Sequence, residues 1–276
     1  MQTTTPMVNG DPNRTAGLLV SVQNECELRI ALRAGVRWID VKDPSRGALG
    51  CPEIDVATGI QRTMILENTA DIHFSVALGE LSETPLNDLI HYTGSFADTA
   101  VFKIALSNCC NRTDWRGLAT TLAKGIGNPN RLILVHYADA NESAAPSWRE
   151  ILLTAREIGS EYLLIDTWGK NGRSLLDFYS VEALQSMIAE ANAFGFRVAI
   201  AGSLPLEALR SLASLGADWI GVRGAVCDGP HRTGSICETK VSIALAKLAK
   251  PFVDPCGLHV QRSSQKIQSN TAGANL

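Results

Sequence analysis

Short runs of apolar and β-branched residues alternate with longer segments of helical periodicity through most of the chain. Eight of these runs have the length and composition of strands, and helical patterns lie between most of them. The runs cover residues 17–22, 36–42, 72–78, 100–106, 131–137, 162–166, 197–202 and 218–224. Eight such units in about 230 residues predict an α/β protein with a single (β/α)8 TIM barrel, which usually needs about 250 residues. An open doubly wound sheet is the alternative.

The residues that begin and end helices agree with this pattern. Asn24 is a suitable N-cap, with Glu27 three residues later and Gly35 at the predicted end of the helix. A second helix is expected to follow Ser203 and to end before Gly216. Residues 48–71 are expected to hold one helix and a loop.

The two ends of the chain lack this periodicity. Residues 1–16 contain neither a basic start nor an apolar stretch, and residues 251–276 are mostly polar. We therefore expect a disordered N-terminal arm at 1–16, a barrel domain at 17–250 and a C-terminal tail at 251–276.

The second predicted strand, in the segment "WIDVKDP", places charged residues on the face that a barrel turns inward. Alternation puts Ile39 and Val41 on one face, and Asp40 and Lys42 on the other. Since the apolar face packs under the helices, Asp40 and Lys42 should point into the barrel near its C-terminal end, where barrel enzymes build their active sites.

Two other even-numbered strands repeat this arrangement. In "VFKIAL" the parity turns Lys103 inward, and in "YLLID" it turns Asp166 inward, with Lys170 four residues later. Inward residues of alternate strands share a layer of the barrel, so Lys42, Lys103 and Asp166 are expected to meet.

These lysines have two interpretations. A lysine at a strand end is often merely solvated, but Lys103 lies within an apolar run that leaves its amine little access to water. Two inward lysines suggest amine chemistry, in which one forms a Schiff base with a carbonyl and the other moves protons or holds a phosphate.

Glycine-containing loops follow the last two strands. "AGSLP" contains Gly202 and Ser203, and "GVRGAVC" contains Arg223 and Gly224. Many barrels bind a phosphate group at these two loops. Any one of these glycines could be a turn glycine and Arg223 a surface charge, but the presence of both loops favours a phosphate site formed by Gly202, Ser203, Arg223 and Gly224.

Composition narrows the possible functions. The formal net charge is −3, from 25 basic and 28 acidic residues, which gives no bulk attraction to nucleic acid or to a membrane. The seven cysteines are an odd number without metal-ligand spacing, as expected of reduced thiols in the cytoplasm. No histidine pair or nucleotide-binding loop is present, so we predict no metal and no cofactor, and we interpret His136 as a packed residue.

Several segments together resemble the (5-formylfuran-3-yl)methyl phosphate synthase family of methanofuran biosynthesis. They are "LLVSV", "IDVKDPSRGALG", "FKIAL", "YADA", "LLIDTWGKNGRSLLDF", "AIAGS" and "GVRGAVC", in this order and at matching spacing, from about Leu18 to about Leu248. None of these segments is specific alone, but the set is.

The resemblance implies a (β/α)8 fold and a lyase that condenses two molecules of glyceraldehyde 3-phosphate into a phosphorylated furan aldehyde, with loss of phosphate and water. It implies that Lys42 is the Schiff-base lysine and Lys103 the proton acceptor. Asp40, Asp166 and Lys170 match further active-site positions of the family.

Two other functions remain open on the sequence. A class I aldolase acting on another phosphosugar would use the same lysines and loops, and a non-catalytic barrel that binds phosphometabolites would need only the loops. For each of these we expect a small-molecule ligand, no nucleic acid and no membrane, and we expect a homo-oligomer.

Overall fold

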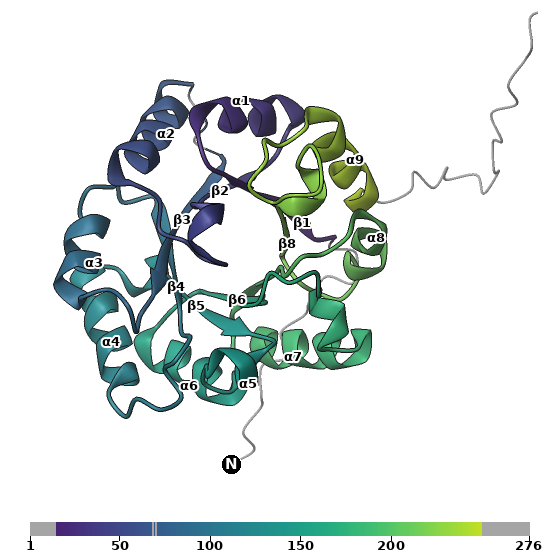
Figure 1. Ribbon diagram of the computed structural model, residues 1–276. Helices are drawn as coiled ribbons and strands as arrows, with labels where there is room; N and C mark the ends of the chain where they lie inside the picture. The colour runs from purple at the N-terminus through teal and green to yellow at the C-terminus, as the bar shows by residue number, and fades with distance from the viewer. Residues whose placement is uncertain (1–14, 68, 70, 250–276) are drawn as a thin grey trace, which may run out of the picture.

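The computed structural model describes residues 15–67, 69 and 71–249, and in this part eight parallel strands close into a barrel. Neighbouring strands pair in the order of the sequence, and β1 pairs with β8 (Figure 1). The strands are β1 Gly17–Val22, β2 Trp38–Val41, β3 His73–Glu80, β4 Ala100–Ala105, β5 Leu132–Tyr137, β6 Tyr162–Asp166, β7 Arg197–Ile200 and β8 Trp219–Val222. The predicted (β/α)8 barrel is confirmed, and the open sheet is excluded.

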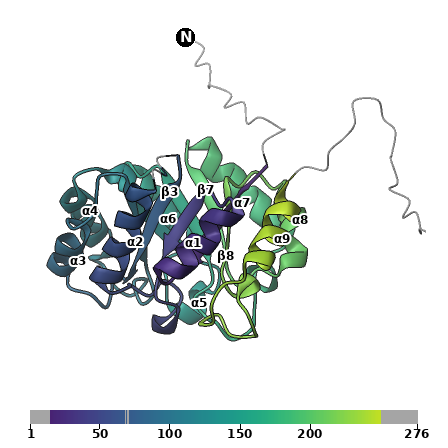
Figure 2. The same cartoon turned by 90° about the horizontal axis from the view of Figure 1, so that it is seen from above.

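A ring of helices surrounds the strands. It is formed by α1 Glu25–Ala34, α2 Ile54–Leu66, α3 Leu86–Thr93, α4 Trp115–Ile126, α6 Trp148–Ile158, α7 Val181–Ala193, α8 Leu209–Leu212 and α9 Glu238–Leu248. A short extra helix, α5 Ala140–Ser143, follows β5. Seen from the side, α5 and the loop between β8 and α9 lie at the same end of the barrel (Figure 2). The described residues also form 3-10 turns: η1 Pro44–Arg46, η2 Pro129–Arg131, η3 Leu175–Asp177, η4 Leu206–Ala208 and η5 Gly224–Val226.

The predicted helix ends agree with the structure in one case and differ in the other. The side chain of Asn24 accepts a hydrogen bond from the backbone N–H of Glu27, and Gly35 ends α1 in the left-handed conformation. The helix expected between Ser203 and Gly216 is instead split into η4 and the four-residue α8. The chain turns sharply at its start, since Ser203 has a φ of 50°.

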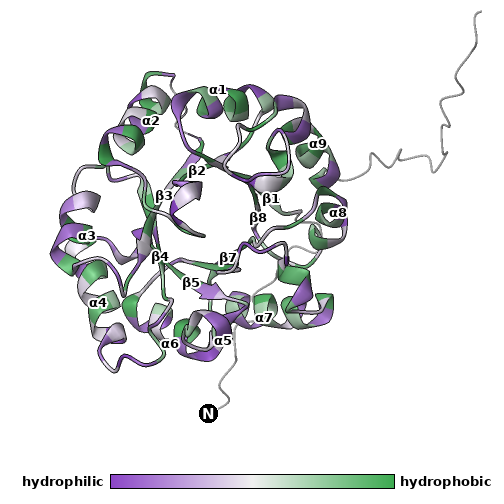
Figure 3. Cartoon of the chain, viewed as in Figure 1, coloured by the Kyte–Doolittle hydropathy of each residue, from purple (hydrophilic) through white to green (hydrophobic). Residues whose placement is uncertain are grey.

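The core has two parts, one on each side of the strands. The larger part lies between strands and helices and includes Ile39, Val41 and Ile104, as the parity argument predicted. The outer helices alternate between hydrophobic and hydrophilic residues, as expected for helices with one buried face (Figure 3). The smaller part fills the lumen and includes Trp38 and Tyr137.

Aromatic rings close the N-terminal end of the lumen. The ring of Trp38 packs edge-on against Trp219 and Tyr162, with centroid separations of 4.9 Å and 5.5 Å. Gly17 makes room for this packing, because a Cβ there would lie 2.4 Å from the Trp219 ring. The lumen is therefore filled at this end, and a site can form only at the other end.

The barrel elements run from Gly17 to Leu248, within the predicted barrel domain. The predicted C-terminal tail, and all of the predicted arm except residues 15 and 16, lie outside the described residues. Within the described ranges, no helix is long and apolar enough to cross a membrane.

Candidate functional site

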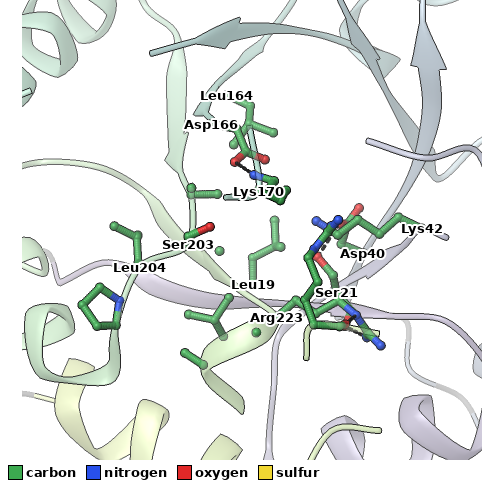
Figure 4. A pocket seen from close by; sticks show the side chains of 18 of the residues that line it. Leu19, Ser21, Asp40, Lys42, Leu164, Asp166, Lys170, Ser203, Leu204 and Arg223 are labelled. Atoms are coloured by element: carbon green, nitrogen blue, oxygen red, sulfur yellow. Dashed lines mark hydrogen bonds and ion pairs between the residues drawn. The ribbon is translucent and has the colours of Figure 1, made fainter. Parts of the chain in front are cut away.

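A cavity of about 370 Å³ opens at the C-terminal ends of the strands. All nine residues singled out in the sequence line it: Asp40, Lys42, Lys103, Asp166, Lys170, Gly202, Ser203, Arg223 and Gly224. Figure 4 shows Asp166 with Lys170, Asp40 with Lys42, and Ser203 on different sides of the same opening. Side chains that are far apart in the sequence therefore meet in one place.

The carboxylate of Asp40 is fully buried and held from several sides. One oxygen accepts hydrogen bonds from Ser75 at 2.9 Å and from the ammonium of Lys103, and the other accepts one from Ser21 at 2.8 Å. The indole N–H of Trp38 donates to Ser75 over 2.9 Å. Burial by itself raises the pKa of Asp40, but the charges of Lys103 and Lys42 and these hydrogen bonds outweigh it and hold the pKa below its ordinary value.

The amine of Lys42 is buried but only weakly bonded. Its Nζ lies 3.3 Å from the carbonyl oxygen of Ala48. Burial lowers the pKa of Lys42 from 10.5 to about 7; Asp166 and Asp40 oppose this shift, and Lys103 adds to it. At neutral pH a large fraction of this amine is therefore unprotonated, which is the form that attacks a carbonyl.

Asp166 and Lys170 form a pair on the opposite wall. Lys170 Nζ lies 2.9 Å from Asp166 Oδ1, the oxygen that also accepts the backbone N–H of Thr167 at 2.7 Å. Burial raises the pKa of Asp166, but Lys170 and Lys42 together with these hydrogen bonds bring it below its ordinary value. The resting site thus contains two carboxylates, each paired with an ammonium.

The loops after β7 and β8 expose backbone donors to the cavity. Gly202 and Ser203 both have positive φ values, of 107° and 50°. In the described part of the chain, the backbone N–H groups of Ser203 and Gly224 donate to no protein acceptor. Gly202 is required here, because a Cβ would lie 3.0 Å from the side chain of Thr167 in addition to the unfavourable φ.

Arg223 has a different environment from the one the sequence suggested. Its guanidinium is buried and donates two bonds to the Glu27 carboxylate, at 2.8 Å and 3.2 Å. Three further bonds reach the carbonyl oxygens of Ser21, Arg232 and Gly234. These five bonds use all five guanidinium N–H groups. The expectation that Arg223 holds a phosphate therefore needs correction: its geometry is that of a residue that anchors the loop after β8.

Several residues in or next to the cavity were not predicted from the sequence. Ser21 and Ser75 could have been found, because both occupy inward positions of strands beside Asp40. Arg232 also lines the cavity, from the loop between β8 and α9. A loop residue has no periodicity, so nothing in the sequence indicated where its side chain would lie.

His136 lies outside this cavity and faces the helices. It is buried, its Nε2 lies 2.9 Å from the hydroxyl of Tyr179, and burial lowers its pKa to about 4. These features agree with the packed histidine expected from the sequence. Within the described residues, no group of three or more His, Cys, Asp or Glu side chains could hold a metal ion.

Several known proteins are similar to this chain over most of its length. The (5-formylfuran-3-yl)methyl phosphate synthase of Methanobrevibacter smithii is 30% identical over 231 residues, which cover 82% of this chain and 95% of that protein. The protein of the same name from Methanothermobacter thermautotrophicus is 31% identical over 223 residues, covering 79% and 93%.

Solved structures show the same fold at low identity. Phosphoribosyl anthranilate isomerase from Thermotoga maritima is 12% identical with a TM-score of 0.57, covering 84% of this chain and 98% of that one. 3-Hexulose-6-phosphate synthase from Salmonella typhimurium is 15% identical with a TM-score of 0.54, covering 84% and 100%. The model of the 4-HFC-P synthase family matches residues 18–244. The chain therefore belongs to the 4-HFC-P synthase family, as the segments quoted from its sequence indicated.

Proposed function

We propose that this protein is a lyase that condenses two molecules of glyceraldehyde 3-phosphate into (5-formylfuran-3-yl)methyl phosphate for a methanofuran-type cofactor. The observation that carries the proposal is the buried amine of Lys42, whose pKa lies at about 7, in a cavity shared with a second lysine and two carboxylates. Membership of the 4-HFC-P synthase family and the names of its relatives support the choice of product.

The overall reaction balances with the release of one inorganic phosphate and two waters. The neutral amine of Lys42 attacks the carbonyl of the first substrate, and loss of water gives an iminium ion. This ion accepts the electron pair left when a proton is removed from the adjacent carbon. The resulting carbon nucleophile attacks the aldehyde of the second substrate. Elimination of phosphate, closure of the ring and loss of two further waters then give the furan, and hydrolysis, which consumes one water, frees Lys42.

The ion pair between Lys103 and Asp40 fixes the order of proton transfers at Lys103. Paired with a carboxylate, Lys103 starts the cycle as an ammonium and cannot accept a proton. It therefore first donates a proton to the hydroxyl formed from the substrate carbonyl, which then leaves the carbon as water to give the iminium ion. The neutral amine then accepts the proton from the substrate carbon, and Lys103 is an ammonium again. Asp166 and Lys170 lie on the other wall and serve the later eliminations.

Substrate phosphate groups bind to the loops after β7 and β8 in this proposal. Ser203 and Gly224 supply open backbone N–H groups, and Gly202 allows the turn that presents them. These donors carry no full charge, so a phosphate dianion also needs a cation close by.

Incubation with glyceraldehyde 3-phosphate alone tests the function. The wild type should generate a furan aldehyde that absorbs in the ultraviolet, together with one inorganic phosphate for each furan. A class I aldolase that acts on another phosphosugar would form an imine with a suitable carbonyl substrate but no furan, and a binding barrel would form neither. If the folded wild type forms no furan from glyceraldehyde 3-phosphate, the proposal is refuted.

A further inference from the structure

The loop between β8 and α9 carries an arginine, Arg232, into the mouth of the cavity. Its Nη1 donates to the carbonyl oxygens of Pro44 and Gly47, both at 2.9 Å. These carbonyls belong to the loop after β2, the strand that leads into Lys42. The side chain thus bridges the loops after β8 and β2, and its guanidinium is held in a fixed position beside the proposed nucleophile.

The second terminal nitrogen of this guanidinium has no partner. Nη2 of Arg232 is buried and makes no hydrogen bond within the described part of the chain. A buried charged donor without an acceptor is costly, and such groups are usually satisfied by a ligand or by water. The two carbonyl oxygens of Pro44 and Gly47 already occupy Nη1, so within the described part of the chain Nη2 and Nε are the nitrogens left for a ligand.

The charges around the cavity favour an anionic ligand. Five cationic side chains line it, of Lys42, Lys103, Lys170, Arg223 and Arg232, against the carboxylates of Asp40 and Asp166. Arg223 is neutralised by Glu27 outside the cavity. Without Arg223, four cationic side chains remain when Lys42 is protonated, and they exceed the two carboxylates by two charges. When Lys42 is neutral, three cations remain and the excess is one charge.

Two lysines of the cavity are already paired with its two carboxylates. Lys103 pairs with Asp40 and Lys170 pairs with Asp166, and in the described part of the chain neither carboxylate forms an ion pair with Arg232, although the charge of Asp166 acts on it. Arg232 also lies close to one of the open backbone donors, because a Cβ on Gly224 would be 3.6 Å from the Cβ of Arg232. The base of the Arg232 side chain and the backbone of Gly224 are therefore neighbours.

We propose that Arg232 binds a phosphate group of the substrate, and that Arg223 acts only as the residue that positions it. Arg223 donates to the carbonyl oxygens of Arg232 and Gly234 and so fixes the backbone at and just after the arginine that faces the cavity. This inference rests on the proposed function for the identity of the substrate, but not for the presence of an anion site.

Calorimetric titration with inorganic phosphate tests the site without any turnover. Arg232→Gln should weaken phosphate binding by about 10- to 100-fold, the usual effect of losing a charged hydrogen bond. Arg232→Lys keeps the charge but loses the fork, so it should bind phosphate more weakly than wild type and more tightly than Arg232→Gln. The matched control is Arg46→Gln, which removes the same charge from an exposed side chain in the loop after β2, where Arg46 pairs with Glu53.

The outcomes separate this inference from the proposed function. The phosphate role would be overturned if Arg232→Gln unfolds at the wild-type temperature and binds phosphate within twofold of the wild-type affinity. It would also be overturned if the wild type does not bind phosphate. An equal loss of phosphate affinity in Arg46→Gln would assign the effect to the overall positive charge of the protein, and would also overturn the phosphate role of Arg232. If the wild type binds phosphate through Arg232 but makes no furan, the anion site stands and the synthase proposal fails.

Discussion

Removing the charge of Lys103 should raise the pKa of Lys42. Lys103 repels the protonated form of Lys42 directly, and it also neutralises Asp40, whose negative charge favours that form. In Lys103→Gln both effects act in the same direction. Asp40 would be left with Lys42 as its nearest cationic partner, and an opposite charge in a protein site commonly shifts a pKa by about one to three units.

The magnitude follows from the fraction of neutral amine. With a pKa of about 7, half of the Lys42 side chains are neutral at pH 7, whereas an ordinary lysine with a pKa near 10.4 would be neutral in roughly one molecule of 2500. A rise of about one to three units would therefore lower the neutral fraction at pH 7 by about 5- to 500-fold. The part of the loss that comes from this smaller neutral fraction should disappear at alkaline pH.

The assay measures the rate at which cyanoborohydride traps glyceraldehyde 3-phosphate on Lys42, with the adduct followed by mass spectrometry. The pH runs from about 6 to about 9.5, a range that brackets the expected midpoint of the wild-type pH profile. Trapping by the wild type should rise with pH through about 7, and Lys103→Gln should show the same rise at higher pH. Lys103→Arg keeps the charge and should keep the wild-type midpoint. Turnover should stay low in Lys103→Gln even where trapping recovers, because its proton acceptor is missing. A midpoint that stays at the wild-type value or falls in Lys103→Gln would refute the electrostatic reasoning.

Three further substitutions examine other parts of the site. Lys42→Arg keeps a positive charge but cannot form an imine, so both the trapped adduct and the furan should be lost; an adduct that maps to Lys103 or Lys170 in the wild type would contradict the role of Lys42. Asp166→Asn should lower kcat by about 10²- to 10⁴-fold. It should also move the pH midpoint of trapping below 7, since Asp166 opposes the fall in the Lys42 pKa. A near wild-type kcat would indicate that Asp166 has only a structural role. Arg223→Met leaves the buried carboxylate of Glu27 without its cation. Urea titrations should show a free energy of unfolding about 3–5 kcal/mol lower than in the wild type. Wild-type stability would contradict the anchoring role of Arg223.

The alternation of polar and apolar residues was enough to predict the barrel and the residues that enter its lumen. Asp40, Lys103 and Asp166 lie in strands, where each position has only two possible directions, and the apolar residues beside them show which direction faces the helices. The (β/α)8 topology then determines which ends of the strands come together.

The loops could not be predicted in the same way. Arg223 and Arg232 are both arginines near the end of β8, and nothing in the sequence distinguishes the one that pairs with a buried carboxylate from the one that faces the cavity. Their roles depend on Glu27, which lies about 200 positions away in the sequence and reaches Arg223 only in the folded protein. Pairing of this kind has no period and no local motif.

The hydrogen bond from Trp38 to Ser75 gives the two carboxylates of the cavity different capacities for protons. An indole N–H can only donate, so the single hydroxyl hydrogen of Ser75 must point at Asp40 Oδ1, which also receives the ammonium of Lys103. A proton could bind to that oxygen only by displacing one of these donors, and the other oxygen, Oδ2, already accepts the hydroxyl of Ser21. Asp166 has more freedom, since within the described part of the chain its Oδ2 accepts no hydrogen bond while Oδ1 accepts two. We therefore expect Asp40 to remain a fixed negative charge throughout the reaction, and protons released during the eliminations to be carried by Asp166.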